Sequence, residues 1–283
     1  MPDLRTRYEE IAAASHRVRQ QSLADVTPID AAHGFVDEVK IWQVVLQDRP
    51  EAAIFAQVIS GLELGLFALA SGLYRQSYGS LRLAVELIAG MSWFSSHRLD
   101  LAEWQAGEKD LIWREITNQE EGILSPRYRK AFFPEISEER KYNGLYAKLY
   151  RELSEHVHGN ARTWASGPDD IVFDQNQQNE WLSKLETFTL VMHVILSLRY
   201  LQELSNEHLR TLNPVLRARA SQVTAILKYF DDRLPPEPMP ANPVGVEGSL
   251  TASVAESPYL EERTAPILET EAPRADSEER RSS

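Results

Sequence analysis

Helical periodicity without strand signals is the feature that most restricts how this chain can fold. Apolar residues recur at intervals of three and four positions over most of residues 3–231, as they do along one face of an α-helix. The chain has a single Asn-Gly pair, Asn143-Gly144, and no alternating pattern flanks it, so a β-hairpin is not indicated. The sequence therefore predicts an all-α fold, a multi-helix bundle of about eight or nine helices.

Proline and glycine residues divide this helical pattern into segments. Pro28 and Pro50 interrupt it in the first part of the chain, and Gly72 allows a turn between two long apolar segments. The junction at Gly72 is short, so we expect the segments on either side to form an antiparallel helical hairpin. The expected helices cover residues 3–24, 29–47, 50–71, 73–97, 99–121, 137–158, 177–206 and 208–231.

The charge of the chain is unevenly distributed. The formal net charge is -12, and residues 234–283 contribute ten acidic residues and four arginines, a net of -6. The same segment holds eight of the fifteen prolines and a single aromatic residue, Tyr259. Such a composition cannot bury enough apolar surface to offset the entropy of ordering. We therefore expect an N-terminal helical extension at 1–49, a helical bundle at 50–233 and a disordered, acidic, Pro-rich tail at 234–283.

Composition also excludes several classes of function. The chain has no cysteine, which rules out disulfide scaffolds, thiolate catalysis and iron–sulfur clusters. The acidic balance argues against extended nucleic-acid binding but leaves room for a small basic pocket. No apolar targeting segment follows the N-terminus, and the apolar stretches at 52–71 and 190–198 are interrupted or short. We expect a cytoplasmic protein with no membrane association and no cofactor.

The residues best suited to chemistry lie at the end of the helix expected at 137–158. With a step of about 100° per residue, Ser154 lies about 60° from Arg151 and His158 about 20° from it, so the three share one face. His156 lies about 140° away and points elsewhere. A histidine can exchange protons near neutral pH, and an arginine can bind a phosphate. Because RNA supplies its own nucleophile, the 2′-OH, such a pair could cleave RNA without a metal ion.

Two motifs in this region resemble known families. The spacing from Arg151 to His156 resembles the Arg-x4-His motif of the HEPN superfamily, and the spacing from Arg151 to His158 resembles its Arg-x6-His form. The chain is also similar to a group of bacterial all-helical proteins with a Leu-Arg-x3-Glu helix followed by a Leu-Ser-x3-His helix. Here these elements are Leu81–Glu86 and Leu153–His158, and the likeness covers residues 50–205.

The HEPN resemblance implies a function and a set of roles. It implies a homodimer in which the motifs of the two copies face one cleft. It also implies that the protein cleaves RNA as a metal-independent endoribonuclease, in a phage-defence or toxin–antitoxin type of system. Arg151 would bind the phosphate, and His156 or His158 would be the catalytic acid and base. Active members often carry Asn, Asp or His directly after the arginine, whereas this chain has Glu152.

A noncatalytic interpretation uses the same residues. Arg82 and Glu86 are four residues apart on one helix and could pair directly. Ser154 and His158 could supply the further hydrogen bonds that a buried ion pair requires. The cluster would then be a structural network in a helical interaction or ligand-binding module. A metal site is not expected, because His156 and His158 point apart on a helix.

Two charged segments complete the set of candidate sites. Arg127, Arg129 and Lys130 precede the Arg–His helix and form either a solvated face or an electropositive rim over a phosphate site. In the acidic tail, Ser257–Leu260 could bind a protein partner. Alternatively, the tail could inhibit a basic cleft of the same molecule.

Overall fold

The computed structural model describes residues 3–137, 139–158, 163 and 171–234. Within these residues the chain forms eleven α-helices, one 3-10 helix and no strand, which confirms the predicted all-α bundle. The residues expected to form the acidic tail lie, except for Leu234, outside the described part of the chain. The helices are α1 (Leu4–Ser22), α2 (Thr27–Val45), α3 (Ile54–Ala70), α4 (Tyr74–Ser96), α5 (Arg98–Gln105), α6 (Trp113–Ile116), α7 (Pro126–Phe132), α8 (Glu139–Val157), α10 (Gln175–Tyr200), η1 (Leu201–Glu203), α11 (Asn206–Arg219) and α12 (Thr224–Arg233).

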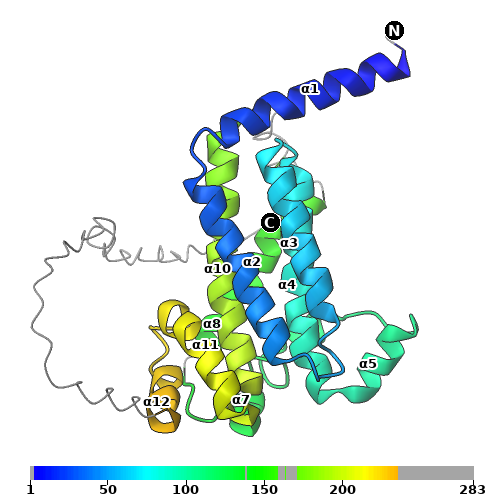
Figure 1. Cartoon of the computed structure of the whole chain (residues 1–283). Helices are drawn as coiled ribbons and strands as arrows, with labels where there is room; N and C mark the ends of the chain where they lie inside the picture. Colours follow the sequence, from blue (N-terminus) through cyan, green and yellow to red (C-terminus); the bar gives the residue numbers. More distant parts are fainter. Residues whose placement is uncertain (1–2, 138, 159–162, 164–170, 235–283) are drawn as a thin grey trace, which may run out of the picture. The chain divides into compact units, whose positions relative to one another are not determined.

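One continuous hydrophobic core holds α2 to α12 together. It extends from Ile29 in α2 to Phe230 in α12, and its largest buried side chains include Trp42 and Trp181. Helices α2, α3, α4 and α10 run alongside one another, and α8 packs against α4 and α10 (Figure 1). The second half of the segment expected as an N-terminal extension, residues 27–45, therefore packs in the same core as the bundle.

Helix α10 lies at the centre of this core. Asp174 caps its N-terminus by accepting hydrogen bonds from the backbone N–H groups of Asn176 and Gln177, at 2.9 and 3.1 Å. Every residue from 191 to 200 is buried. The segment Gln175–Glu203 is the one described helix with the length and hydropathy of a membrane span, and 67% of its apolar window is buried inside the bundle.

The predicted hairpin is present as α3 and α4. Gly72 joins the two helices with φ of 76°, a left-handed conformation that favours glycine. A Cβ atom at this position would lie 3.0 Å from Val18 Cγ1 and 3.2 Å from Ile171 Cγ2, so the site also lacks space for a side chain.

Two of the expected helices are each divided in the structure, which raises the number of helices above the predicted eight or nine. The segment expected as one helix at 99–121 ends at Gln105, and Gly107 turns the chain with φ of 75°. The segment at 208–231 is divided into α11 and α12 because Ala220 and Val223 turn into the core. No glycine or proline marks that second break, so the sequence pattern did not reveal it.

Candidate functional site

Arg82 forms the centre of a polar cluster between α4 and α8. Its Nε atom donates a hydrogen bond to Ser154 Oγ at 3.0 Å, one terminal nitrogen donates to Glu86 Oε2 at 3.3 Å, and the other donates to the Tyr150 hydroxyl. The side chains of Arg82 and Glu86 are each 20% exposed. We call these four residues the Arg82 cluster. The predicted network members Arg82, Glu86 and Ser154 are brought together.

Tyr150 is the member that sequence reasoning missed. The Cζ atom of Arg82 lies 4.7 Å from the centroid of the Tyr150 ring, and Trp113 stacks on this ring at 3.5 Å. Ser154 Oγ donates to the carbonyl oxygen of Tyr150 at 2.7 Å, the back-bond that a helical serine makes four residues away. Burial and the nearby Glu86 carboxylate raise the pKa of the Tyr150 hydroxyl, so it stays a neutral hydrogen-bonding group.

The antiparallel packing of α4 and α8 positions this cluster. The hydroxyl of Tyr146 donates to the carbonyl oxygen of Val85 on one side of it. On the other side, Arg75 donates to the carbonyl oxygen of Val157 at 3.1 Å. Both ends of the interface are therefore fixed by hydrogen bonds, and the Arg82 cluster lies between them.

Arg151 and His158 lie on the solvent-facing side of α8. Both residues are exposed, and neither side chain forms a hydrogen bond or ion pair with any residue that the structure describes. They are seven residues apart, which corresponds to about 10 Å along the helix axis. Ser154, expected on the same face, turns instead toward Arg82. The contribution expected from His158 to the network is not seen, and Tyr150 supplies the additional hydrogen bond.

His156 points into the bundle. Its ring stacks on Tyr78 with centroids 3.6 Å apart, and its side chain is 13% exposed. Burial lowers the pKa of His156 below its ordinary value, although Glu180, 3.9 Å away, opposes this effect. Of the two histidines expected as acid and base, His158 alone faces solvent with Arg151. The carboxylate of Glu152 pairs with Lys184 of α10 at 2.9 Å rather than with Arg151.

The basic residues before α8 do not form a continuous rim. Arg127 pairs with Glu121 at 2.6 Å, and Arg129 donates to the carbonyl oxygen of Pro134 at 2.6 Å. Lys130 is exposed. Arg127 lies beside the first half of α8, about 20 Å along the axis from His158. Arg127 and His158 therefore lie near opposite ends of this helix, with Arg151 between them.

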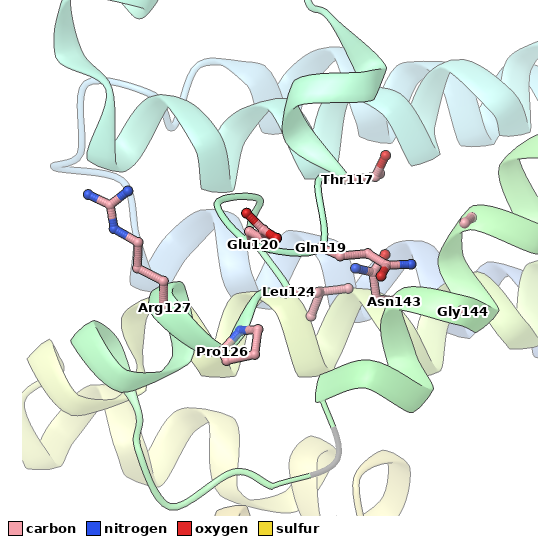
Figure 2. Close-up of a pocket in the computed structure, with 9 residues that line it drawn as sticks. Thr117, Gln119, Glu120, Leu124, Pro126, Arg127, Asn143 and Gly144 are labelled. Atoms are coloured by element: carbon pink, nitrogen blue, oxygen red, sulfur yellow. The ribbon is translucent and has the colours of Figure 1, made fainter.

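A cavity of about 690 Å³ opens between the segment 117–127 and the first half of α8. Figure 2 shows its lining, with the side chains of Gln119, Leu124 and Asn143 near its centre. We call it the α8 cavity. Its volume is in the range that small-molecule sites occupy. It is lined by Thr117, Gln119, Glu120, Leu124, Pro126, Arg127, Asn143, Gly144 and Ala147.

Several polar groups of the α8 cavity have no protein partner. The side chains of Gln119, Glu120 and Asn143 make no hydrogen bond or ion pair with any described residue. A Cβ atom at Gly144 would meet nothing within 4 Å, so this glycine keeps the α8 side of the cavity open. In the sequence, Asn143-Gly144 was weighed only as a possible hairpin turn, and no cavity was predicted there.

A second polar cluster joins α2, α10 and α11 around the buried side chain of His193. The indole N–H of Trp42 donates to His193 Nδ1 at 3.0 Å, which leaves the ring hydrogen on Nε2. This Nε2–H donates to Glu38 Oε2 at 2.9 Å, and Arg219 donates to the other carboxylate oxygen at 2.8 Å. His193 is 0% exposed and both of its ring nitrogens have a partner, so it contributes to the packing of the core.

No family model, curated protein or solved structure matches this chain. The HEPN resemblance therefore stays a prediction that rests on the short motifs around Arg82 and Arg151. Among the described residues, no group of three or more His, Asp or Glu side chains is placed to hold a metal ion.

Proposed function

We propose that this protein is a noncatalytic helical module that binds a small polar ligand in the α8 cavity. The observation that carries the proposal is that Gln119, Glu120 and Asn143 face one cavity without protein partners. Polar groups in a half-enclosed site are normally satisfied by protein, water or a ligand. The Arg82 cluster, in contrast, has its donors occupied within the protein and serves to hold α4 against α8.

The lining favours an uncharged or cationic ligand of nucleoside size. Glu120 and Arg127 are the charged residues of the lining, and the guanidinium of Arg127 is already paired with Glu121, outside the lining, at 2.6 Å. This balance disfavours a phosphate. The carboxamides of Gln119 and Asn143 can donate and accept together, as the edge of a nucleobase requires. Glu120 can accept from an exocyclic amino group.

Apolar contacts in the same cavity suit a flat ring. Leu124 and Pro126 contribute side chains on one side, and Gly144 and Ala147 leave a shallow surface on α8. A base lying against these residues would bury both of its faces while its edge meets the polar groups. We therefore assign the ligand class as a nucleoside or an unpaired base that carries an amino group.

Cytidine and uridine form a matched pair for testing this assignment, because cytidine carries an amino group at the position where uridine carries a carbonyl group. Isothermal titration calorimetry with the full chain should show cytidine binding at least about tenfold more tightly than uridine, a difference of about 1.4 kcal/mol. Glu120→Gln should remove most of that preference. Equal affinities for the two nucleosides, or no binding of either, would contradict the proposal.

A variant that fills the cavity gives an independent control. Gly144→Leu introduces a side chain where a Cβ meets open space, so the fold should tolerate it while the ligand is excluded. Gly34→Leu is the matched control, because Gly34 also lies in a helix with nothing within 4 Å of its Cβ and is not part of the cavity. We expect cytidine binding to be lost in the first variant and retained in the second.

A second candidate function is the metal-independent ribonuclease that the HEPN resemblance implies. The specific observation in its favour is that Arg151 and His158 are both exposed and unpaired among the described residues. Because these residues are about 10 Å apart along one helix, the proposal requires a homodimer that brings Arg151 of one copy near His158 of the other. The test is cleavage of single-stranded RNA in the presence of a chelator. Unchanged activity in Arg151→Ala and His158→Ala would exclude it.

A further inference from the structure

Helix α1 leaves half of its apolar stripe uncovered. The stripe follows a spacing of four and three residues through Leu4, Tyr8, Ile11, Ser15 and Val18, which is the heptad spacing of a helix that packs against another helix. Val18 is buried against the bundle. In contrast, Leu4 is 72% exposed, Tyr8 66% and Ile11 44%. The packing face therefore continues beyond the part of α1 that the bundle covers.

The two halves of α1 have different surroundings. The C-terminal half is anchored, because Arg19 donates to Ser71 Oγ at 2.9 Å and its guanidinium lies 5.2 Å from the Phe67 ring centroid. The N-terminal half extends away from the other helices (Figure 1). An isolated helix of about ten residues is marginal in water, and most helices are stabilised by packing of an apolar face. The exposed half of the stripe is a surface suited to a second helix.

The charges closest to the stripe are positive. With a step of about 100° per residue, Arg7 and Arg19 lie about 60° to either side of its centre line. Arg5 lies about 100° away on one side and Asp3 about 100° away on the other, where the Asp3 carboxylate caps the helix by accepting from Thr6. Glu9 and Glu10 lie on the opposite face, about 120–140° away. Neither Arg5 nor Arg7 forms an ion pair with a described residue. A second copy of α1 would bring the same basic flanks, whereas an acidic helix would complement them.

We propose that residues 4–11 of α1 form a docking surface for a partner protein, and that the partner supplies an amphipathic helix whose apolar stripe is flanked by Asp or Glu. Apolar contacts with Leu4, Tyr8 and Ile11 give the affinity, and Arg5 and Arg7 give the preference for acidic flanks. The surface is separate from the α8 cavity, so this inference does not depend on the proposed ligand.

Two designed peptides test the proposal directly. Both contain three heptads with Leu at the core positions; one has Glu and the other Lys at the flanking positions. Fluorescence anisotropy with the full chain should show the Glu peptide binding at least about tenfold more tightly than the Lys peptide, with the difference shrinking at high salt. The double substitution Arg5→Glu and Arg7→Glu should reverse the preference.

Variants of exposed residues separate docking from folding. Tyr8→Ala combined with Ile11→Ala should weaken binding of the Glu peptide by at least about tenfold without changing the melting temperature. The matched control, Glu9→Gln with Glu10→Gln, changes the opposite face and should leave binding within about twofold. Equal binding of both peptides, or binding of neither, would overturn the proposal. So would a dimer in sedimentation equilibrium that the Tyr8 and Ile11 variant dissociates, because the occupant would then be a second copy.

Discussion

The Arg82 cluster and the α8 cavity are built on the same helix, yet their polar groups are in opposite situations. In the Arg82 cluster, guanidinium, carboxylate and hydroxyl groups all bind one another within a half-buried interface. In the cavity, three polar side chains face an open space of about 690 Å³ without a protein partner.

The difference shows that reactive residue types in this fold can be satisfied by one another within the protein. Arginine, glutamate and tyrosine next to one another suggest catalysis, but here they satisfy one another and join two helices. Gln119 and Asn143 have ordinary chemistry, and among the described residues no group uses their hydrogen-bonding capacity. This capacity, beside an open volume, is the basis of the proposed ligand site.

The His193 cluster is the more deeply buried of the two satisfied networks, because His193 and Trp42 are fully buried and Glu38 is 13% exposed. His193→Ala would leave the Trp42 indole N–H without its partner in the core and the Glu38 carboxylate with Arg219 alone. We expect it to lower the free energy of unfolding by about 4 kcal/mol, because breaking a buried pair leaves an uncompensated polar group. Urea denaturation followed by circular dichroism measures the loss. A loss below about 1 kcal/mol would show that this network contributes little.

Arg82→Ala tests the first side of the comparison. It removes three hydrogen bonds from a part-exposed site, and we expect a loss of about 2–3 kcal/mol. Arg151→Ala and His158→Ala are controls on the solvent face of α8 and should each change stability by less than about 0.5 kcal/mol. If Arg82→Ala were as neutral as these controls, the cluster would not be structural and a functional role for Arg82 would be favoured.

Stability should also depend on pH through the histidines, with a smaller effect. Burial lowers the pKa of His193 below 6.5 despite Glu38, and burial also lowers that of His156. Between the lowered pKa and 6.5 the unfolded chain binds more protons than the folded one, so stability falls as the pH drops through this window. Below pH 4.5 the free energy of unfolding falls further, because Glu38 becomes protonated. Burial would raise the pKa of Glu38, but hydrogen bonds from His193 and Arg219 hold it below its ordinary value.

The variant His193→Gln isolates the contribution of this one histidine. Urea denaturation at pH 7.5, 6.5 and 5.5 should show a smaller decrease in stability for the variant than for the natural chain. His156 would account for the part of the decrease that remains. An identical decrease in both proteins would mean that the environment of His193 does not determine its protonation.

Features of the fold and of the candidate site could be predicted from the sequence where they depend on residues that are close together along the chain. The all-α class and the hairpin around Gly72 follow from local periodicity and one glycine. The pairing of Arg82 with Glu86 follows from a spacing of four residues. Ser154 agrees with the network interpretation, in which it bonds to Arg82, and not with the expectation that it faces the same way as Arg151 and His158.

The remaining features depend on packing between segments. Tyr150 lies four residues before Ser154, but the partner of its hydroxyl is fixed by the register of α8 against α4. The His193 cluster joins residues up to 181 positions apart. The α8 cavity exists because a loop fails to fill the space beside Gly144, and no residue pattern encodes an empty volume.

Gly144→Ala tests the cavity side of the comparison and has the smallest expected effect. Alanine is favoured over glycine in a helix by about 0.5–1 kcal/mol, and apart from its chain neighbours and the backbone of its own helix nothing lies within 4 Å of the added Cβ. We therefore expect the free energy of unfolding to rise by about that amount, as it should for Gly34→Ala in α2. A loss of stability at Gly144 alone would mean that the cavity closes in solution.

Mapping of a bound nucleoside by nuclear magnetic resonance is the most direct test of the central claim. Backbone amide signals of the full chain would be followed during titration with cytidine. The account predicts shifts confined to residues 117–127 and 143–147, with the signals of Arg82, Ser154 and His158 unchanged. Shifts centred on Arg151 and His158, or no shifts at saturating cytidine, would contradict it.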